Sequence, residues 1–112
     1  IKNSDIISIN MNYSKQEKLL NKKRLDLCKK NCLIINTSRS DIIDNNYLFQ
    51  LLKKNKIFGA CMDVFDTEPY YGKFTNLNNV ILTPHIGSYS SEIRSEMEIE
   101  ALGHILSIKI KY

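Results

Sequence analysis

The 112-residue sequence contains few glycines and prolines, four and two respectively, and it has no Gly-x-Gly-x-x-Gly motif. That motif forms the phosphate-binding turn of dinucleotide-binding folds, so the chain does not encode this turn. The sequence also lacks a charged segment followed by an apolar stretch, and it has no apolar run of membrane-spanning length. We therefore expect neither a secretion signal nor a membrane-spanning helix in these residues.

Cysteine is scarce, and its three positions favour neither a disulfide framework nor a zinc site. An odd number leaves one thiol unpaired in any pairing scheme of Cys28, Cys32 and Cys61. Cys61 lies inside an apolar run, where a small buried thiol is expected. Cys28 and Cys32 have no second pair of ligands nearby, so we expect no metal site. These features favour a reducing compartment, the cytoplasm.

Basic residues outnumber acidic residues by 16 to 12, which gives a net charge of +4. The lysines cluster in residues 22–24, 29–30 and 53–56, on or just after expected helices. Lysine there suits a solvated surface and the negative C-terminal end of the helix dipole. No aromatic residues interleave with these clusters, as they do on surfaces that stack nucleobases. We interpret the clusters as solvated helix ends and expect no nucleic-acid partner.

Short apolar runs alternate with helical patterns along the chain. They predict four strands, at residues 6–9, 33–35, 57–64 and 80–82, and a polar loop over 70–79. A capping box at Ser14 and Glu17 predicts a helix to about Leu27, and Asp44 and Ser90 are expected to cap two later helices. The apolar stripes of those two helices are Tyr47, Leu48, Leu51 and Leu52, and Ile93, Met97, Ala101 and Ile105.

Strands that are apolar throughout and alternate with helices are typical of a parallel sheet covered on both faces. We therefore predict an α/β fold, half of a doubly wound, Rossmann-like parallel sheet with flanking helices. Within the third strand, Gly59 and Ala60 are small enough for a neighbouring backbone or ligand to come close.

Three polar residues, Arg39, Glu68 and His85, each follow a predicted strand. Because ligands bind beyond the carboxyl ends of the strands in open α/β sheets, we expect all three at one edge. A guanidinium can hold a carboxylate through two parallel hydrogen bonds, and an imidazole exchanges protons near neutral pH. A glutamate bonded to the ring would orient it and stabilise its charged form. The combination fits a hydride-transfer site for a 2-hydroxy acid.

Each of these residues taken singly also has an ordinary structural explanation. An arginine after a strand is usually a surface residue, Glu-Pro is a common loop dipeptide, and Thr-Pro-His can be a simple turn. Their joint occurrence in this order, with Asp63 a short distance before Glu68, favours the functional interpretation. His104 lies within a helical pattern and matches no motif, so we interpret it as an ordinary helical residue.

Four segments carry a resemblance to a known family: Ser4–Ser8, Asn36–Arg39, Asp63–Pro69 and Leu82–Gly87. They resemble the C-terminal half of the nucleotide-binding domain of the D-2-hydroxyacid dehydrogenases. The resemblance implies that residues 1–112 are the C-terminal part of an NAD(P)-binding Rossmann-like domain, with the phosphate-binding half and the substrate domain absent. The chain alone is therefore expected to be inactive.

In the intact protein, the resemblance implies an oxidoreductase that transfers a hydride between NAD(P) and a D-2-hydroxy acid or 2-keto acid. The implied catalytic residues are Arg39, Glu68 and His85. The implied cofactor is NAD, with NADP as an alternative, and Asp63 takes the position whose carboxylate accepts a hydrogen bond from the nicotinamide carboxamide. The full set of implied cofactor contacts is Asn10, Asn12, Ser14, Thr37, Ser38, Arg39, Asp63, His85, Gly87 and Ser88.

The chain departs from the family pattern at a few positions. Ser40 stands where the family usually has glycine after the arginine, so we expect a strained backbone there. Asn10 and Asn12 replace the commoner His and Pro, and Ser88 replaces a second glycine. These changes affect the cofactor loops and leave every catalytic group in place.

The implied activity is similar to that of D-3-phosphoglycerate, glyoxylate/hydroxypyruvate or D-lactate enzymes, and Glu68 disfavours the formate dehydrogenases. Two other interpretations remain open. One is an NAD-sensing interaction protein like the C-terminal-binding-protein corepressors, and the other is an inactive remnant. Selectivity for the side chain of the acid is expected to come from the substrate domain. The family is commonly dimeric, so a homodimer is expected.

Overall fold

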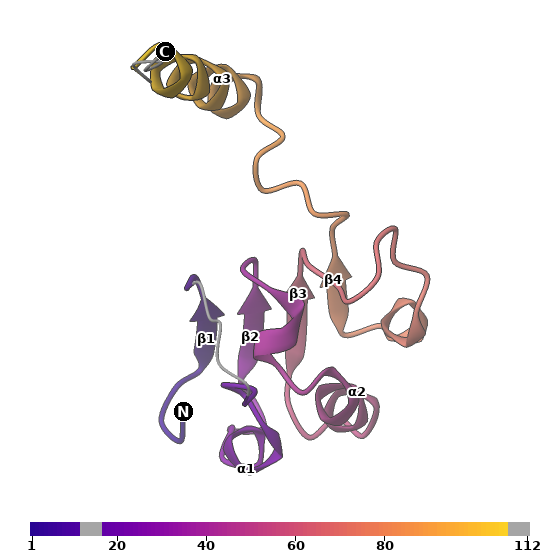
Figure 1. Ribbon diagram of the computed structural model, residues 1–112. Helices are drawn as coiled ribbons and strands as arrows, with labels where there is room; N and C mark the ends of the chain where they lie inside the picture. The colour runs from indigo at the N-terminus through magenta and orange to yellow at the C-terminus, as the bar shows by residue number, and fades with distance from the viewer. Residues whose placement is uncertain (12–16, 108–112) are drawn as a thin grey trace.

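The computed structural model of the chain describes residues 1–11 and 17–107. Four parallel strands form one sheet in the order β1-β2-β3-β4 (Figure 1). They are β1 (Ile6–Ile9), β2 (Leu33–Asn36), β3 (Gly59–Met62) and β4 (Val80–Leu82). The predicted α/β fold, with a parallel sheet and flanking helices, is confirmed.

Helices α1 (Lys22–Leu25) and α2 (Asn45–Lys53) pack on one face of the sheet. On the opposite face, the side chains of Ile6 and Ile81 are 60% and 64% exposed. The expected cover on both faces is therefore wrong for the residues that the structure describes. Crossovers between parallel strands are right-handed, and every crossover here steps in the same direction. The described parts of the connections consequently lie over the same face of the sheet.

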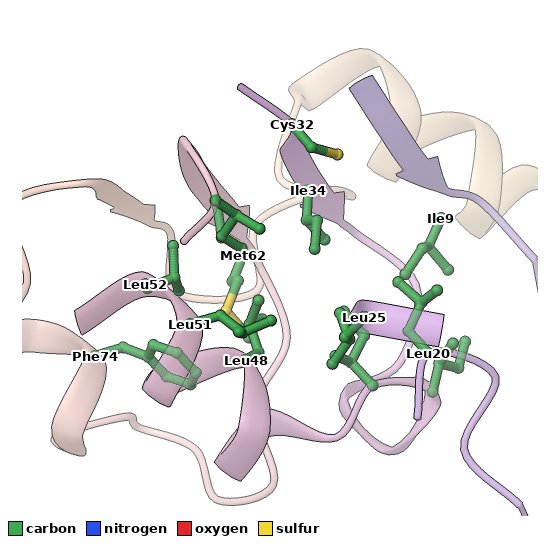
Figure 2. Packing of buried hydrophobic residues seen from close by; sticks show 14 residues of the cluster. Ile9, Leu20, Leu25, Cys32, Ile34, Leu48, Leu51, Leu52, Met62 and Phe74 are labelled. Atoms are coloured by element: carbon green, nitrogen blue, oxygen red, sulfur yellow. The ribbon is translucent and has the colours of Figure 1, made fainter. Parts of the chain in front are cut away.

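The hydrophobic core lies between that face and the two helices (Figure 2). Ile34 and Met62 from the sheet meet Leu25, Leu48 and Leu52 from the helices, and each of these side chains is almost fully buried. Burial of one such side chain contributes about 1.5–3 kcal/mol to folding. This packing fixes the strands, and with them the positions from which the loops at the carboxyl edge begin.

The first helix is shorter than predicted. Helix α1 begins after Asn21, whose side-chain oxygen accepts a hydrogen bond from Arg24 N at 3.1 Å. Leu20 N donates to Ile42 O, and Leu20 forms an isolated parallel bridge with Ile43. This pairing keeps residues 17–20 out of the helix, so the capping pattern was misleading there. Ser14, the other member of the predicted capping box, lies outside the described residues.

Helix α2 and strand β3 agree better with the sequence pattern. The carboxylate of Asp44 accepts a hydrogen bond from Tyr47 N at 3.1 Å, which confirms the predicted cap. Strand β3 is shorter than the predicted 57–64 because Ile57 and Val64 are buried without pairing in the sheet. The close approach expected at Gly59 is confirmed, since a Cβ there would lie 2.8 Å from the carbonyl oxygen of Asn79.

The predicted polar loop over residues 70–79 contains one turn of 3-10 helix, Lys73–Asn76. Phe74 in this turn is buried and packs edge-on against Phe49, with ring centroids 5.8 Å apart. The loop, predicted to be polar with aromatic residues, therefore adds a buried apolar side chain to the core, and this burial was not predicted.

Helix α3 (Ser91–Ser107) lies away from the sheet, beyond the carboxyl ends of the strands (Figure 1). The predicted cap is confirmed, because Ile93 N donates to Ser90 Oγ at 3.1 Å. The predicted apolar stripe is exposed, with Met97 54% and Ile105 64% accessible. In the described part of the chain, no helix is both long enough and apolar enough to cross a membrane.

Candidate active site

The carboxyl ends of the four strands lie at one edge of the sheet (Figure 1), and each predicted catalytic residue follows one of these ends in the sequence. Arg39 lies shortly after β2, Glu68 lies in the loop after β3, and His85 lies shortly after β4. The strands are parallel and in register, so their ends point the same way. This is the edge at which open α/β sheets bind ligands.

His85 and Glu68 are in direct contact. Nδ1 of the imidazole lies 2.9 Å from Oε2 of the carboxylate, and both side chains are partly exposed. The other carboxylate oxygen, Oε1, accepts a hydrogen bond from Phe65 N at 3.0 Å. The glutamate is therefore held on one side by the backbone and holds the ring on the other. This is the pairing that the sequence predicted.

These contacts also act on the titration of Glu68. The hydrogen bond with His85, followed by that from Phe65 N–H, lowers the pKa of the Glu68 carboxyl. A carboxyl group whose pKa is lower in the folded protein than in the unfolded chain stabilises the fold. This contribution is fully present at pH values above the pKa of the unfolded chain, about 4.3 for glutamate. That contribution is lost as the pH falls through the folded value.

We expect His85→Ala to raise the pKa of Glu68, because the larger of its two stabilising hydrogen bonds disappears. The measurement is a carbon NMR titration of the glutamate carboxyl groups. Glu92 is the internal control, since its pKa is lowered by groups at its own helix terminus, residues 90–92, and not by His85. An unchanged Glu68 titration, or an equal change at Glu92, would contradict the contact.

The loop that carries Arg39 is fixed by Asn36, which is fully buried at the end of β2. Its side-chain oxygen accepts from Ser38 N at 3.1 Å, and its Nδ2 donates to the carbonyl oxygen of Arg39 at 2.9 Å. The guanidinium itself is exposed, and its Nη1 donates to the Ser38 carbonyl at 2.8 Å. Asn36 was not among the residues predicted for the site. A polar residue ending an apolar strand just before a motif was the available signal.

The strain expected at Ser40 is not found. Among the described residues other than glycine, only Asn55 and His85 have a positive φ. Ser40 begins a 3-10 helix, and its hydroxyl accepts a hydrogen bond from Asn45 Nδ2 at 2.8 Å. A serine is therefore compatible with this backbone, and the prediction of strain was wrong.

A cavity of about 400 Å³ opens between the ends of β1 and β2. Its lining residues are Asn10, Met11, Thr37, Ser38 and Arg39. Thr37 Oγ1 donates to Asn10 Oδ1 at 3.4 Å, and Ser38 Oγ donates to the Met11 carbonyl. Amide, hydroxyl and guanidinium groups suit the polar parts of a nucleotide cofactor or a carboxylate substrate.

The predicted cofactor residues divide into groups. Asn10, Thr37, Ser38 and Arg39 line the cavity between β1 and β2. His85, Gly87 and Ser88 lie in the loop after β4, on the other side of β3, and do not line it. Asn12 and Ser14 lie outside the described residues.

Asp63 lies between these two groups, directly after β3, and is 5% exposed. Its Oδ1 accepts from Thr83 Oγ1 at 2.6 Å and from Ile86 N at 2.9 Å, and its Oδ2 accepts from Gly87 N at 3.2 Å. Burial alone would raise the pKa of this carboxyl, but the three hydrogen bonds outweigh burial and lower it. Thr83, like Asn36, was not among the residues predicted for the site.

Comparison with known proteins identifies the chain's relatives. The model of the D-isomer specific 2-hydroxyacid dehydrogenase NAD-binding domain matches residues 1–87. A glyoxylate reductase of Thermococcus litoralis is 43% identical over 99 residues, which cover 87% of this chain and 30% of that protein. A glyoxylate reductase of Pyrococcus horikoshii is 42% identical over 92 residues, covering 81% of this chain and 28% of that protein.

Solved structures give the same result. An acyclic imino acid reductase in complex with NADPH and D-Arg superposes with a TM-score of 0.86 at 37% identity, covering 95% of this chain and 34% of that one. A glyoxylate reductase from Paecilomyes thermophila superposes with a TM-score of 0.85 at 30% identity, covering 93% of this chain and 32% of that one. The chain thus spans about a third of the length of these relatives. Because the family model matches most of its residues, the chain belongs to the D-isomer specific 2-hydroxyacid dehydrogenase family, and its residues 1–87 match the NAD-binding domain of that family.

Proposed function

We propose that this chain forms the nicotinamide side of the NAD-binding domain in an NAD(P)-dependent D-2-hydroxyacid dehydrogenase. The observation that carries the proposal is the contact between His85 and Glu68, at the same sheet edge as Arg39. Residues 1–112 supply the C-terminal part of that domain. The glycine-rich phosphate turn and the substrate domain belong to other parts of the intact protein.

In this proposal Arg39 binds the substrate carboxylate. A guanidinium matches a carboxylate with two parallel N–H donors, which fixes both the position and the orientation of the acid. Asn36 supports this role, because both polar atoms of its buried amide hold the turn from which the guanidinium projects. The substrate carbon next to the carboxylate is thereby held at a constant distance from the loop after β2.

His85 exchanges the proton of the substrate hydroxyl. Its Nδ1 faces Glu68, so Nε2 is the nitrogen that takes the proton during oxidation and returns it during reduction. Glu68 orients the ring through this contact, and the same hydrogen bond lowers the pKa of the Glu68 carboxyl. When bound, NAD(P) accepts the hydride released from the same substrate carbon, and donates it in the reverse direction.

The proposed cofactor contacts lie at three places along the carboxyl edge of the sheet. Residues of the cavity between β1 and β2, Asn10 and Thr37–Arg39, lie on one side. Asp63 lies in the middle, and His85, Gly87 and Ser88 lie on the other side. The acyclic imino acid reductase that superposes on this chain was solved with NADPH, so both NADH and NADPH are candidates. Since two relatives are glyoxylate reductases, small 2-keto acids are the first substrates to test.

The test measures oxidation of NADH and NADPH by the full-length protein with glyoxylate, hydroxypyruvate and pyruvate. We expect turnover with at least one of these acids and, in the reverse direction, oxidation of D-lactate but not L-lactate. The 112-residue chain alone should show no turnover, because it lacks the phosphate-binding turn. Tight NADH binding by the full-length protein without turnover of any 2-keto acid would contradict the enzyme and favour a sensing role.

A further inference from the structure

The loop after β4 wraps around the carboxylate of Asp63. The carboxylate accepts hydrogen bonds from the hydroxyl of Thr83, which precedes His85, and from the backbone N–H groups of Ile86 and Gly87, which follow it. Both carboxylate oxygens are used, and Asp63 itself is buried at the end of β3. One side chain, that of Asp63 directly after β3, therefore binds the chain both before and after His85.

We call these three hydrogen bonds to Asp63 the clamp. The backbone conformation of His85 explains why the clamp is needed. Its φ of 56° lies in the left-handed region, which residues with a β-carbon rarely adopt. The only other described non-glycine residue with a positive φ is Asn55, and asparagine and histidine adopt this region more often than most residues with a β-carbon do. His85 N also donates to the Thr83 carbonyl at 3.0 Å, so the turn is tight. A disfavoured backbone conformation persists when surrounding contacts fix it, and such conformations concentrate at active sites.

The position of the imidazole depends on this turn. Glu68 is fixed separately, through Phe65 N in the loop after β3. The contact between His85 Nδ1 and Glu68 Oε2 is therefore a second connection between the loop after β4 and the segment that follows β3, beside the hydrogen bonds to Asp63. If His85 returned to an ordinary negative φ, its Cα–Cβ bond would point in another direction and the ring would leave the carboxylate.

We propose that Asp63 and Thr83 are positioning residues that hold His85 in its left-handed conformation and so place its ring against Glu68. This inference rests on the proposed function of His85 as the proton-exchanging group. It differs from the cofactor contact that the family resemblance implies for Asp63, because the clamp acts through the loop after β4 and does not require the nicotinamide.

Thr83→Val in the full-length protein separates the two roles. Valine keeps the shape of threonine and leaves the Asp63 carboxylate in place, but it removes the hydroxyl that donates at 2.6 Å. We expect kcat to fall roughly ten-fold, the effect of losing one hydrogen bond to a charged group, with the KM for NADH unchanged. Thr83→Ser restores the donor and should recover most of the lost kcat.

Thr75→Val is the matched control. The hydroxyl of Thr75 donates to the Gly72 carbonyl at 2.8 Å, in the connection before β4 and away from the carboxyl edge. This variant loses a hydroxyl of the same type without touching Asp63, and its kcat should equal that of the parent.

Asp63→Asn gives an independent result. Each oxygen of Asp63 accepts at least one N–H or O–H group. Either orientation of an asparagine amide would turn its NH₂ toward a donor, so the clamp would be broken. An asparagine still has a carbonyl oxygen for the nicotinamide carboxamide. The clamp therefore predicts a larger loss of kcat than in Thr83→Val, whereas a cofactor contact alone predicts a small one.

Crystal structures of these variants test the inference without any activity. We expect the φ of His85 to leave the left-handed region, or its Nδ1 to move away from Glu68, in Asp63→Asn. Failure of the proposed function would appear as an inactive parent with its His85 conformation intact. The clamp itself is overturned if His85 keeps its conformation in both variants, or if the KM for NADH rises in proportion to the loss of kcat.

Discussion

His85→Ala in the full-length protein is expected to reduce kcat by about 10²–10⁴-fold, the usual effect of removing a positioned proton-transfer group. Without the imidazole, the substrate hydroxyl has no partner that both accepts its proton and is held in place by a carboxylate. The KM for NADH should change little, because the proposed cofactor contacts of the β1–β2 side remain. The measurement is steady-state kinetics with the best 2-keto acid and NADH.

The chain supplies its own control for this variant. His104 is its only other histidine, and it lies on the exposed helix α3. Its Nε2 is 3.7 Å from Glu100, one helical turn away, so the ring makes an ordinary surface contact. His104→Ala should retain parental turnover. Near-parental turnover in His85→Ala, or equal losses in both variants, would refute the proton-exchange role.

The positions of the site residues could be predicted from the sequence because they depend on where strands end. The apolar runs before Arg39 and His85 locate the ends of β2 and β4 closely, and β3 ends just before Asp63. In a parallel sheet those ends share one edge, whatever the details of the loops. The contact between His85 and Glu68 then required only that the two loops approach each other, which they do.

The groups that hold the site could not be predicted in the same way. Asn36 makes two hydrogen bonds within its own turn, with Ser38 N and with the Arg39 carbonyl, so its role depends on the geometry of that turn. Thr83 donates one hydrogen bond to Asp63, a residue distant in sequence, so its role depends on a tertiary contact. The left-handed conformation of His85 is likewise invisible in a sequence, because a positive φ is uncommon for any residue other than glycine. These features follow from packing at the edge of the sheet.

The errors in the secondary-structure prediction have the same origin. Residues 17–20 are not helical, because Leu20 pairs with Ile43 in the segment before α2 and this pairing outweighs the local helical signal. The sheet is covered on one face because all its crossovers step in one direction, a property of strand order. Apolar runs indicate buried strands, but they do not tell that one face of the strands is exposed in the described residues.

Arg39→Lys is expected to raise the KM for the 2-keto acid by about 10–100-fold, the effect of losing a hydrogen bond between charged groups. Lysine keeps the positive charge, but its ammonium group is a point charge and cannot match a carboxylate with two parallel donors. The KM for NADH should change much less, because Asn10, Thr37 and Ser38 continue to line the cavity between β1 and β2. Steady-state kinetics with each substrate varied in turn separates the two effects.

Arg24→Lys is the matched control for that variant. Arg24 is also exposed, and its Nη1 donates to the Leu19 carbonyl at 2.7 Å, a one-point contact that a lysine can reproduce. Both KM values should therefore stay at their parental level. The proposed contact with the substrate carboxylate predicts that Arg39→Lys raises the KM for the keto acid much more than the KM for NADH. Equal losses of affinity for the keto acid and for NADH would instead make Arg39 a cofactor or scaffold residue.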